Sequence, residues 1–136
     1  ITSGKILSLD IKKMEKIKNV SFLKCNFLEK NIKEKILKFF GENLDVIISD
    51  MAANTTGNKS LDCIRTNQLC AEVIEFSSSV LKPNGVLISK IFMGDDFIET
   101  KELAKSRFKK VQFFKPEASR NESKETYLHC ATLKTL

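Results

Sequence analysis

Two short apolar runs, each marked by a charged residue, limit the possible folds of this chain most strongly. The first covers residues 45–49 and ends at Asp50, and the second covers residues 85–92 and contains Lys90. About 35 residues with helical character separate the runs, which is enough for one crossover helix between parallel strands. The sequence therefore predicts a strand–helix–strand unit with adjacent strands. Asp50 and Lys90 are then expected side by side at the carboxyl edge, where open α/β sheets bind ligands.

Each of the two charged residues could instead have a purely structural role. The run at 45–49 is continuous and β-branched, which predicts a strand buried on both faces. Asp50 alone is explained equally well as a cap of the following segment. Lys90 is harder to explain in this way, because an unpaired ammonium inside a buried strand is costly.

The rest of the chain alternates strand-like and helix-like segments, which predicts an α/β, doubly wound, Rossmann-like sheet. Apolar spacing and turn residues predict strands at 5–10, 20–25, 44–49, 86–91, 110–114 and 125–133. The helical spacing predicts helices at 31–40, 62–81 and 97–108. No helix separates the last two strands, so we expect an antiparallel pair. The last strand then begins at Glu125, at the same edge as Asp50 and Lys90.

Local signals give the expected helix boundaries. Gly41 is expected to stop the first helix, and Asp96 with Glu99 fits a capping pair at the start of the third. The second helix is expected to end in a turn at residues 82–85. Its buried face is expected to use the apolar residues Leu69, Val73, Phe76 and Val80.

The composition is that of an ordinary globular protein, with 136 residues, 42% of them hydrophobic and 29% charged. This length predicts a single domain spanning residues 1–136. No apolar stretch approaches the roughly 18 residues that span a membrane, and the first residues lack the pattern of a signal peptide. We therefore expect a cytoplasmic protein with no membrane partner, and a monomer by default.

The four cysteines show no spacing typical of metal ligands. They lie at positions 25, 63, 70 and 130, and the single histidine is His129. None forms a Cys-x-x-Cys pair, so we expect buried or half-buried apolar thiols and no metal site.

A net charge of +6 favours an anionic partner such as nucleic acid. The evidence is weak by itself, because a run of charges is most often a solvated face. More informative is a cluster of basic residues late in the chain, at Lys101, Lys105, Arg107, Lys109, Lys110, Lys115, Arg120 and Lys124.

Several motifs together resemble the FtsJ/RrmJ family of methyltransferases over essentially the whole chain. The first is Ser49-Asp50-Met51-Ala52-Ala53-Asn54-x-Thr56-Gly57, which is similar to the family's Ser-Asp-Met-Ala-Pro-Asn-x-Ser-Gly. The others follow in the family's order: Asp62-x-x-Arg65, Leu81-x-Pro83-x-Gly85, Lys90-Ile91-Phe92-x-Gly94 and Lys115-Pro116-x-x-Ser119-Arg120-x-x-Ser123-x-Glu125-x-Tyr127. Each motif is weak alone, whereas the combination is specific.

The resemblance implies an S-adenosylmethionine-dependent methyltransferase that acts on the 2′-hydroxyl of a ribose, expected in uridine, in large-subunit ribosomal RNA. Asp50, Lys90 and Glu125 match the last three members of the family's Lys-Asp-Lys-Glu catalytic set. Lys90, as a neutral amine, is the expected general base, and the two carboxylates are expected to orient it.

The resemblance also implies binding residues. Asp10 matches the acid that binds the cofactor ribose, Asn26 and Phe27 match the adenine site, and Asp50 lies near the methionine part of the cofactor in this family. We expect contacts with RNA phosphates from Arg65, Lys115, Arg120 and Lys124. Arg65 could instead pair with Asp62.

The chain departs from the family pattern mainly at its start. The glycine-rich cofactor loop on the family's first strand, and the first catalytic lysine, match nothing here. The family's sheet order puts that strand between the strands at 5–10 and 44–49, where its absence would leave backbone groups unpaired. We therefore expect this sequence to be an N-terminally incomplete methyltransferase domain. Ala53 and Thr56 are milder departures, and Asn26 replaces the usual aspartate.

Two other functions stay open. Without the cofactor loop, the chain could be an inactive methyltransferase-like module that binds RNA or a protein. A nucleotide-dependent oxidoreductase on a similar fold is disfavoured, because no Gly-x-Gly-x-x-Gly motif is present.

Overall fold

The computed structural model describes residues 4–94, 96–115, 117 and 125–135. The chain divides into two compact units, Ile1–Glu42 and Asn43–Leu136, and each unit is described by itself. The expected single domain over 1–136 stays a prediction. None of the described helices combines the length and apolar character needed to cross a membrane.

The first unit is a small parallel sheet with one helix. Strands β1 (Leu7–Asp10) and β2 (Ser21–Lys24) pair in parallel, and α1 (Ile32–Phe40) follows. Helix α1 ends as expected at Gly41, which adopts a left-handed conformation with φ 73° and donates its N–H to Leu37 O.

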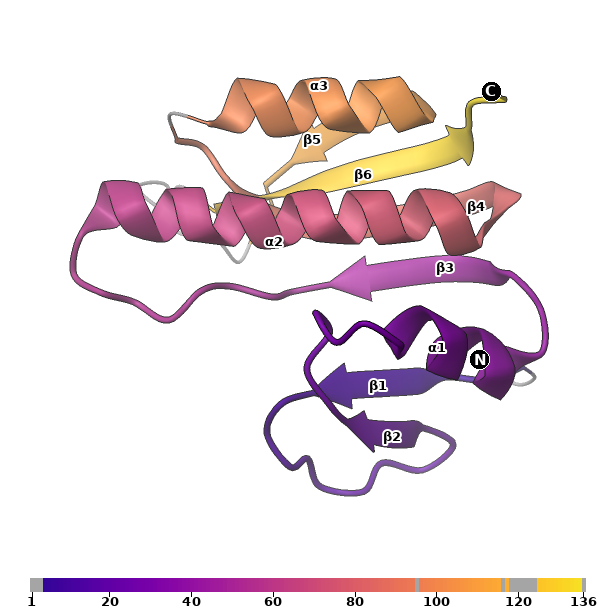
Figure 1. The fold of residues 1–136 in the computed structure, drawn as a ribbon. Helices are drawn as coiled ribbons and strands as arrows, with labels where there is room; N and C mark the ends of the chain where they lie inside the picture. Colours follow the sequence, from indigo (N-terminus) through magenta and orange to yellow (C-terminus); the bar gives the residue numbers. More distant parts are fainter. Residues whose placement is uncertain (1–3, 95, 116, 118–124, 136) are drawn as a thin grey trace. The chain divides into compact units, whose positions relative to one another are not determined.

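The second unit is a four-stranded mixed sheet with two helices (Figure 1). The strand order is β3-β4-β6-β5. Strands β3 and β4 are parallel, whereas β6 lies antiparallel between β4 and β5. The elements are β3 (Leu44–Ser49), α2 (Lys59–Val80), β4 (Leu81–Phe92), α3 (Phe97–Arg107), β5 (Phe108–Phe114) and β6 (Glu125–Leu133). The predicted strand–helix–strand unit and late antiparallel strand are confirmed.

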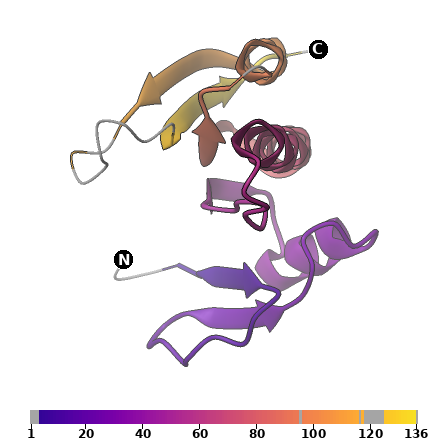
Figure 2. The same ribbon diagram turned by 90° about the vertical axis from the view of Figure 1, so that its left-hand side faces the viewer.

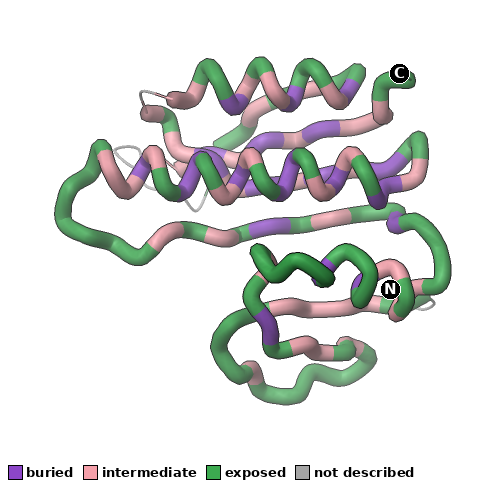
Figure 3. The backbone as a smooth tube through the Cα atoms, viewed as in Figure 1, coloured by how far each residue is buried: buried purple, intermediate pink, exposed green. Residues whose placement is uncertain are grey.

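Both helices of the second unit pack on one face of its sheet, as Figure 2 shows end-on. Burial alternates along β4 and β6, as the purple and pink segments of Figure 3 show. The buried positions of β4 lie on the helix side, since the side chain of Ser89 forms a hydrogen bond with Cys70 of α2. Completely buried apolar residues form this core: Ile74, Val80, Leu87, Ile91, Ala104, Leu128 and Cys130. A fully buried aliphatic side chain stabilises a fold by about 1.5–3 kcal/mol, so this layer holds the sheet edge in place.

Five sequence predictions need correction. Strand β3 is not buried on both faces: Val46 is 53% and Ile48 72% exposed, because they lie on the sheet face that α2 and α3 do not cover. Strand β3 is also at the edge of the sheet and pairs with β4 alone among the described strands. Helix α2 begins at Lys59 rather than Asp62, since the Asn58 side chain accepts a hydrogen bond from Leu61 N at 3.2 Å and caps it.

The second pair of corrections concerns a turn and a cap. Residues 82–85 belong to β4, where they form an irregularity between the pairs Leu44–Leu81 and Val46–Val86. Asp96 is at the N-cap position of α3, but its side chain makes no capping hydrogen bond. Its carboxylate accepts a hydrogen bond from Asn67 instead, at 2.8 Å.

The buried face of α2 also differs from the prediction. Val73 and Val80 are buried, whereas Leu69 and Phe76 are only half-buried. The buried side of the helix is partly polar and includes Cys63, Thr66, Asn67, Cys70, Val73, Ile74, Ser77 and Val80. All four cysteines are free and buried, as the sequence predicted.

Candidate active site

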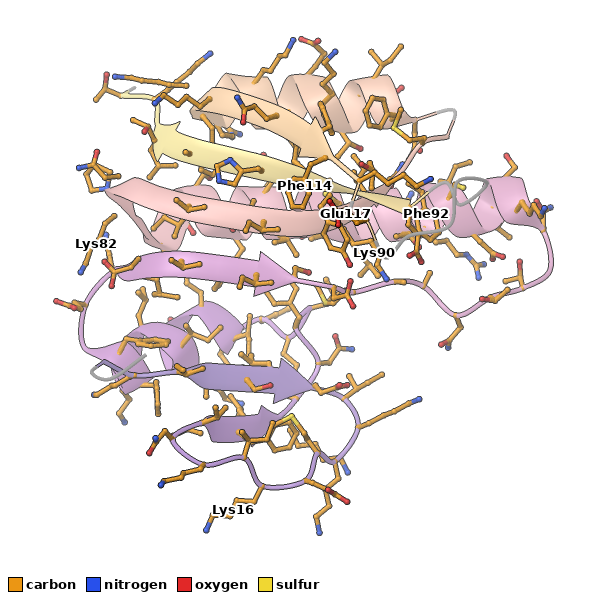
Figure 4. The ribbon with its side chains drawn as sticks, turned by 180° about the vertical axis from the view of Figure 1, so that it is seen from behind. Lys16, Lys82, Lys90, Phe92, Phe114 and Glu117 are labelled. Atoms are coloured by element: carbon orange, nitrogen blue, oxygen red, sulfur yellow. The ribbon has the colours of Figure 1, made fainter. Side chains whose placement is uncertain are left out.

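Lys90 lies near the carboxyl end of β4, on the sheet face opposite α2 and α3. Its neighbours Ser89 and Ile91 are buried on the helix side, so strand alternation turns Lys90 to the other face. Figure 4 shows this face from the front, with Lys90, Phe92 and Phe114 grouped at one edge of the sheet. The Lys90 side chain is only 12% exposed, which makes partners for its ammonium group necessary.

Two carboxylates from neighbouring strands supply these partners. Lys90 Nζ lies 3.2 Å from Asp50 Oδ1 and 3.5 Å from Glu125 Oε1. Asp50 follows β3 directly, and parallel pairing brings it next to Lys90. Antiparallel β6 begins at this same edge, where Glu125 pairs with Phe92. The expected proximity of the three residues is confirmed, and their catalytic roles stay predictions.

A fourth side chain joins the cluster. The Tyr127 hydroxyl donates a hydrogen bond of 2.6 Å to Asp50 Oδ1. This hydrogen bond, with smaller effects of burial and of the charges on Asp50 and Glu125, raises the pKa of Tyr127 to about 12. Sequence reasoning placed Tyr127 in a motif but gave it no role. Its position two residues after Glu125 was an available signal, because residues i and i+2 of a strand share a face.

The loop after Asp50 is tied to the start of α2. Ala53 N donates to Thr66 Oγ1 at 3.1 Å. The backbone N–H and hydroxyl of Thr56 both donate to Asp62 Oδ1, at 2.9 Å and 2.7 Å. These hydrogen bonds are the main reason why the pKa of Asp62 is lowered, and the charge of Arg65 adds a smaller effect. The loop is thereby fixed where it leaves the site.

Asn67 of α2 secures the end of β4, a role that sequence reasoning missed. It is completely buried. Its side chain accepts from Phe92 N at 2.8 Å and donates to Phe92 O at 2.9 Å and to Asp96 Oδ1 at 2.8 Å. A polar residue in the buried stripe of a helix was the available signal, since buried amides are normally hydrogen-bonded.

The three remaining cofactor candidates lie at one edge of the two-stranded sheet in the first unit. Asp10 ends β1, is exposed, and accepts a hydrogen bond from Lys12 N at 3.1 Å. Asn26 and Phe27 follow β2, and Cys25 N donates to Asp10 O at 2.9 Å, which joins the two strand ends. The side chain of Asn26 accepts from Leu28 N at 2.9 Å. The structure therefore brings these three positions to one edge.

The four predicted RNA contacts are placed only in part. Arg65 is exposed on α2, and Lys115 is exposed directly after β5. Arg120 and Lys124 lie outside the described residues. Within the described ranges, no group of three or more His, Cys, Asp or Glu residues could hold a metal ion.

The sequence is similar to two bacterial proteins named ribosomal RNA large subunit methyltransferase E. It is 43% identical to the Pelagibacter ubique protein over 134 residues, which are 98% of this chain and 66% of that one. It is 45% identical to the Rickettsia akari protein over 126 residues, which are 93% of this chain and 56% of that one. The chain therefore spans less than two thirds of the length of these relatives.

Solved structures share the fold. A Plasmodium falciparum protein assigned as a ribosomal RNA methyltransferase matches with a TM-score of 0.82 and 26% identity, over 95% of this chain and 72% of that one. A Streptococcus mutans methyltransferase in complex with SAH matches with a TM-score of 0.55 and 16% identity, over the same shares, and supports the fold alone. Residues 1–133 also match the sequence profile of FtsJ-like methyltransferases. The chain therefore belongs to the FtsJ-like methyltransferase family.

Proposed function

We propose that this protein transfers a methyl group from S-adenosylmethionine to the 2′-hydroxyl of a ribose, in a uridine of large-subunit ribosomal RNA. One observation carries the proposal: a largely buried lysine is held between two carboxylates at the ligand edge of the sheet. The names of the relatives supply the substrate class. A chain that only bound RNA would have no need to keep a lysine in this position.

Lys90 is the residue that we propose as general base, a role that requires its ammonium group, which is paired with Asp50 and Glu125 in the structure, to release a proton first. When bound, S-adenosylmethionine supplies an electrophilic methyl group on its sulfonium. As the ribose oxygen forms its bond to carbon, and the bond from that carbon to sulfur breaks, the neutral amine of Lys90 takes the hydroxyl proton. Asp50 and Glu125 contact the Lys90 amino group through their carboxylate oxygens and fix the direction of its side chain.

The residues of the first unit fit a ribose and an adenine chemically. The exposed carboxylate of Asp10 can accept hydrogen bonds from ribose hydroxyls. Asn26 presents an amide and Phe27 an aromatic ring, which suit the edge and the face of a purine. Replacing Asp10 with alanine should weaken S-adenosylmethionine binding by about tenfold or more, because hydrogen bonds to a charged group contribute about 1.5–3 kcal/mol. Calorimetric titration measures this loss, and unchanged affinity would exclude Asp10 from the site.

Methyl transfer from labelled S-adenosylmethionine to large ribosomal subunits tests the role of Lys90. The variant Lys90→Met should lose activity by several orders of magnitude while cofactor affinity changes little. Lys82→Met is a matched control, because Lys82 also lies on β4 and pairs with a carboxylate, Asp45 at 3.0 Å. Figure 4 shows it at the opposite end of the strand from Lys90.

The control variant should keep the wild-type rate. Equal rates for Lys90→Met and the wild type would exclude Lys90 as the base. RNA binding without methyl transfer by the full-length wild-type protein would support the inactive binding module instead.

A further inference from the structure

Of the two carboxylates that contact Lys90, Asp50 is the more exposed. Asp50 comes after the last residue of β3, and its side chain is 67% exposed, whereas that of Lys90 is 12% exposed. An exposed carboxylate beyond the end of a strand gains little from a single ion pair, because solvent screens the charge and side-chain entropy opposes the fixed geometry. Holding Asp50 against Lys90 therefore needs a second contact.

Tyr127 supplies that contact from the other side of Lys90. Its hydroxyl donates to Asp50 Oδ1, the same oxygen that lies nearest Lys90 Nζ. Lys90 pairs with Tyr127 in the sheet register, and Tyr127 pairs with Phe114. The Tyr127 hydroxyl on β6 therefore reaches across Lys90 of β4 to the carboxylate of Asp50, which follows β3. Charge-assisted hydrogen bonds of this length are among the stronger contacts in proteins.

The ring of Tyr127 is itself held in place. It stacks on Phe114 with a centroid distance of 5.7 Å and an interplanar angle of 23°. Such aromatic pairs contribute about 0.5–1.5 kcal/mol beyond the area they bury. Phe114 thus holds the ring of Tyr127 by stacking, and the hydroxyl of Tyr127 holds the carboxylate of Asp50 by a hydrogen bond.

We propose that Tyr127 is a positioning residue, which holds the Asp50 carboxylate in the geometry that orients Lys90 for proton transfer. This inference rests on the proposed function. The hydroxyl remains a donor at neutral pH, since the pKa of Tyr127 is raised to about 12. The charged groups that face this hydroxyl on the same side of the sheet are Asp50, Lys90 and Glu125, with His129 two residues further along β6.

The contact between Tyr127 and Asp50 can be tested without an activity assay. Tyr127 is the only tyrosine of the chain, so biosynthetic incorporation of 3,5-difluorotyrosine labels this position alone and brings the phenol titration to lower pH. Titration by fluorine NMR should show a pKa above that of the free amino acid. Asp50→Asn should lower it, because the main cause of the raised pKa is removed.

Asp45→Asn is the matched control for this titration. It neutralises another carboxylate associated with β3, and Asp45 contacts Lys82 rather than Tyr127. The Tyr127 titration should be the same in this variant as in the wild type. A titration at the pKa of free difluorotyrosine, or one that Asp50→Asn leaves unchanged, would overturn the contact and the proposal with it.

The role in catalysis is tested with Tyr127→Phe, which keeps the ring and its stacking partner. We expect kcat to fall about tenfold, with KM for RNA and for S-adenosylmethionine unchanged, as for an interaction made in the transition state. Thr126→Val is the control: its hydroxyl donates to Phe114 O at 2.7 Å on the opposite side of β6, and kcat should not change.

The outcomes separate the two proposals. An inactive full-length wild-type protein would contradict the proposed methyl transfer itself. An active wild type with an equal kcat for Tyr127→Phe would leave methyl transfer standing and overturn the role of Tyr127. A raised KM with unchanged kcat would also overturn it, because it would make Tyr127 a substrate-binding residue.

Discussion

Replacing Asn67 with leucine should destabilise the second unit strongly. The change keeps a side chain of similar size but removes three hydrogen bonds, to Phe92 N, Phe92 O and Asp96 Oδ1. Asn67 is completely buried, so water cannot easily replace these contacts. Each buried polar group that loses its partner costs about 1–3 kcal/mol, which gives a loss of about 3 kcal/mol or more. Stabilities of about 5–15 kcal/mol are usual for small domains, so the loss is large.

Urea denaturation followed by circular dichroism measures the free energy of unfolding for this comparison. Gln68→Leu is the control, because Gln68 is the next residue of α2 and is exposed. It should change stability by less than about 0.5 kcal/mol, as surface substitutions usually do. If Asn67→Leu cost no more than Gln68→Leu, the hydrogen bonds of Asn67 would not be what secures the end of β4.

Three further predictions concern other parts of the chain. Burial raises the pKa of Cys70 to about 11 and that of Cys130 to about 12. A thiol reagent at pH 8 should therefore modify neither cysteine before the protein unfolds. Rapid labelling of the native protein would contradict their burial. The lowered pKa of Asp62 adds stability at neutral pH that is lost as pH falls below its ordinary value of 3.8. Asp62→Asn should therefore be less stable than the wild type at pH 6, and the difference in urea midpoint should shrink by pH 3; a constant difference would refute the linkage. RNA affinity should fall steeply with salt, and Lys115→Ala should reduce the slope of log affinity against log salt by about 1; an unchanged slope would exclude a phosphate contact there.

The order of strands and helices could be predicted because it depends on local patterns. Gly41 after a segment with apolar residues at helical spacing indicated the end of α1, and the lack of a helix before Glu125 indicated an antiparallel final strand. The positions of Asp50 and Lys90 followed from a general property of parallel sheets, whose strand ends share one edge. These signals are contained within a few residues of the chain.

The side-chain contacts could not be predicted in the same way, because their partners are distant in sequence. Tyr127 and Asp50 are 77 positions apart, and Asn67 lies 25 positions before Phe92. The apolar spacing of α2 predicted that Leu69 is buried, although it is only half-buried. The spacing gave no sign that Asn67 is buried, because its partners Phe92 and Asp96 are distant in sequence. The exposure of Ile48 could not be predicted from the apolar run itself, since a β-branched run does not show whether both faces of its strand are covered. Only the family resemblance, which places the unmatched first strand beside residues 44–49, indicated an open position there.

The most direct test of the central claim is the chemical position of the methyl group. Large ribosomal subunits that lack the modification would be incubated with S-adenosylmethionine and either the wild-type protein or Lys90→Met, and nucleosides from their RNA would be analysed by mass spectrometry. The account predicts 2′-O-methyluridine with the wild type and none with Lys90→Met. A methyl group on a base, or the same yield of 2′-O-methyluridine from both proteins, would contradict it.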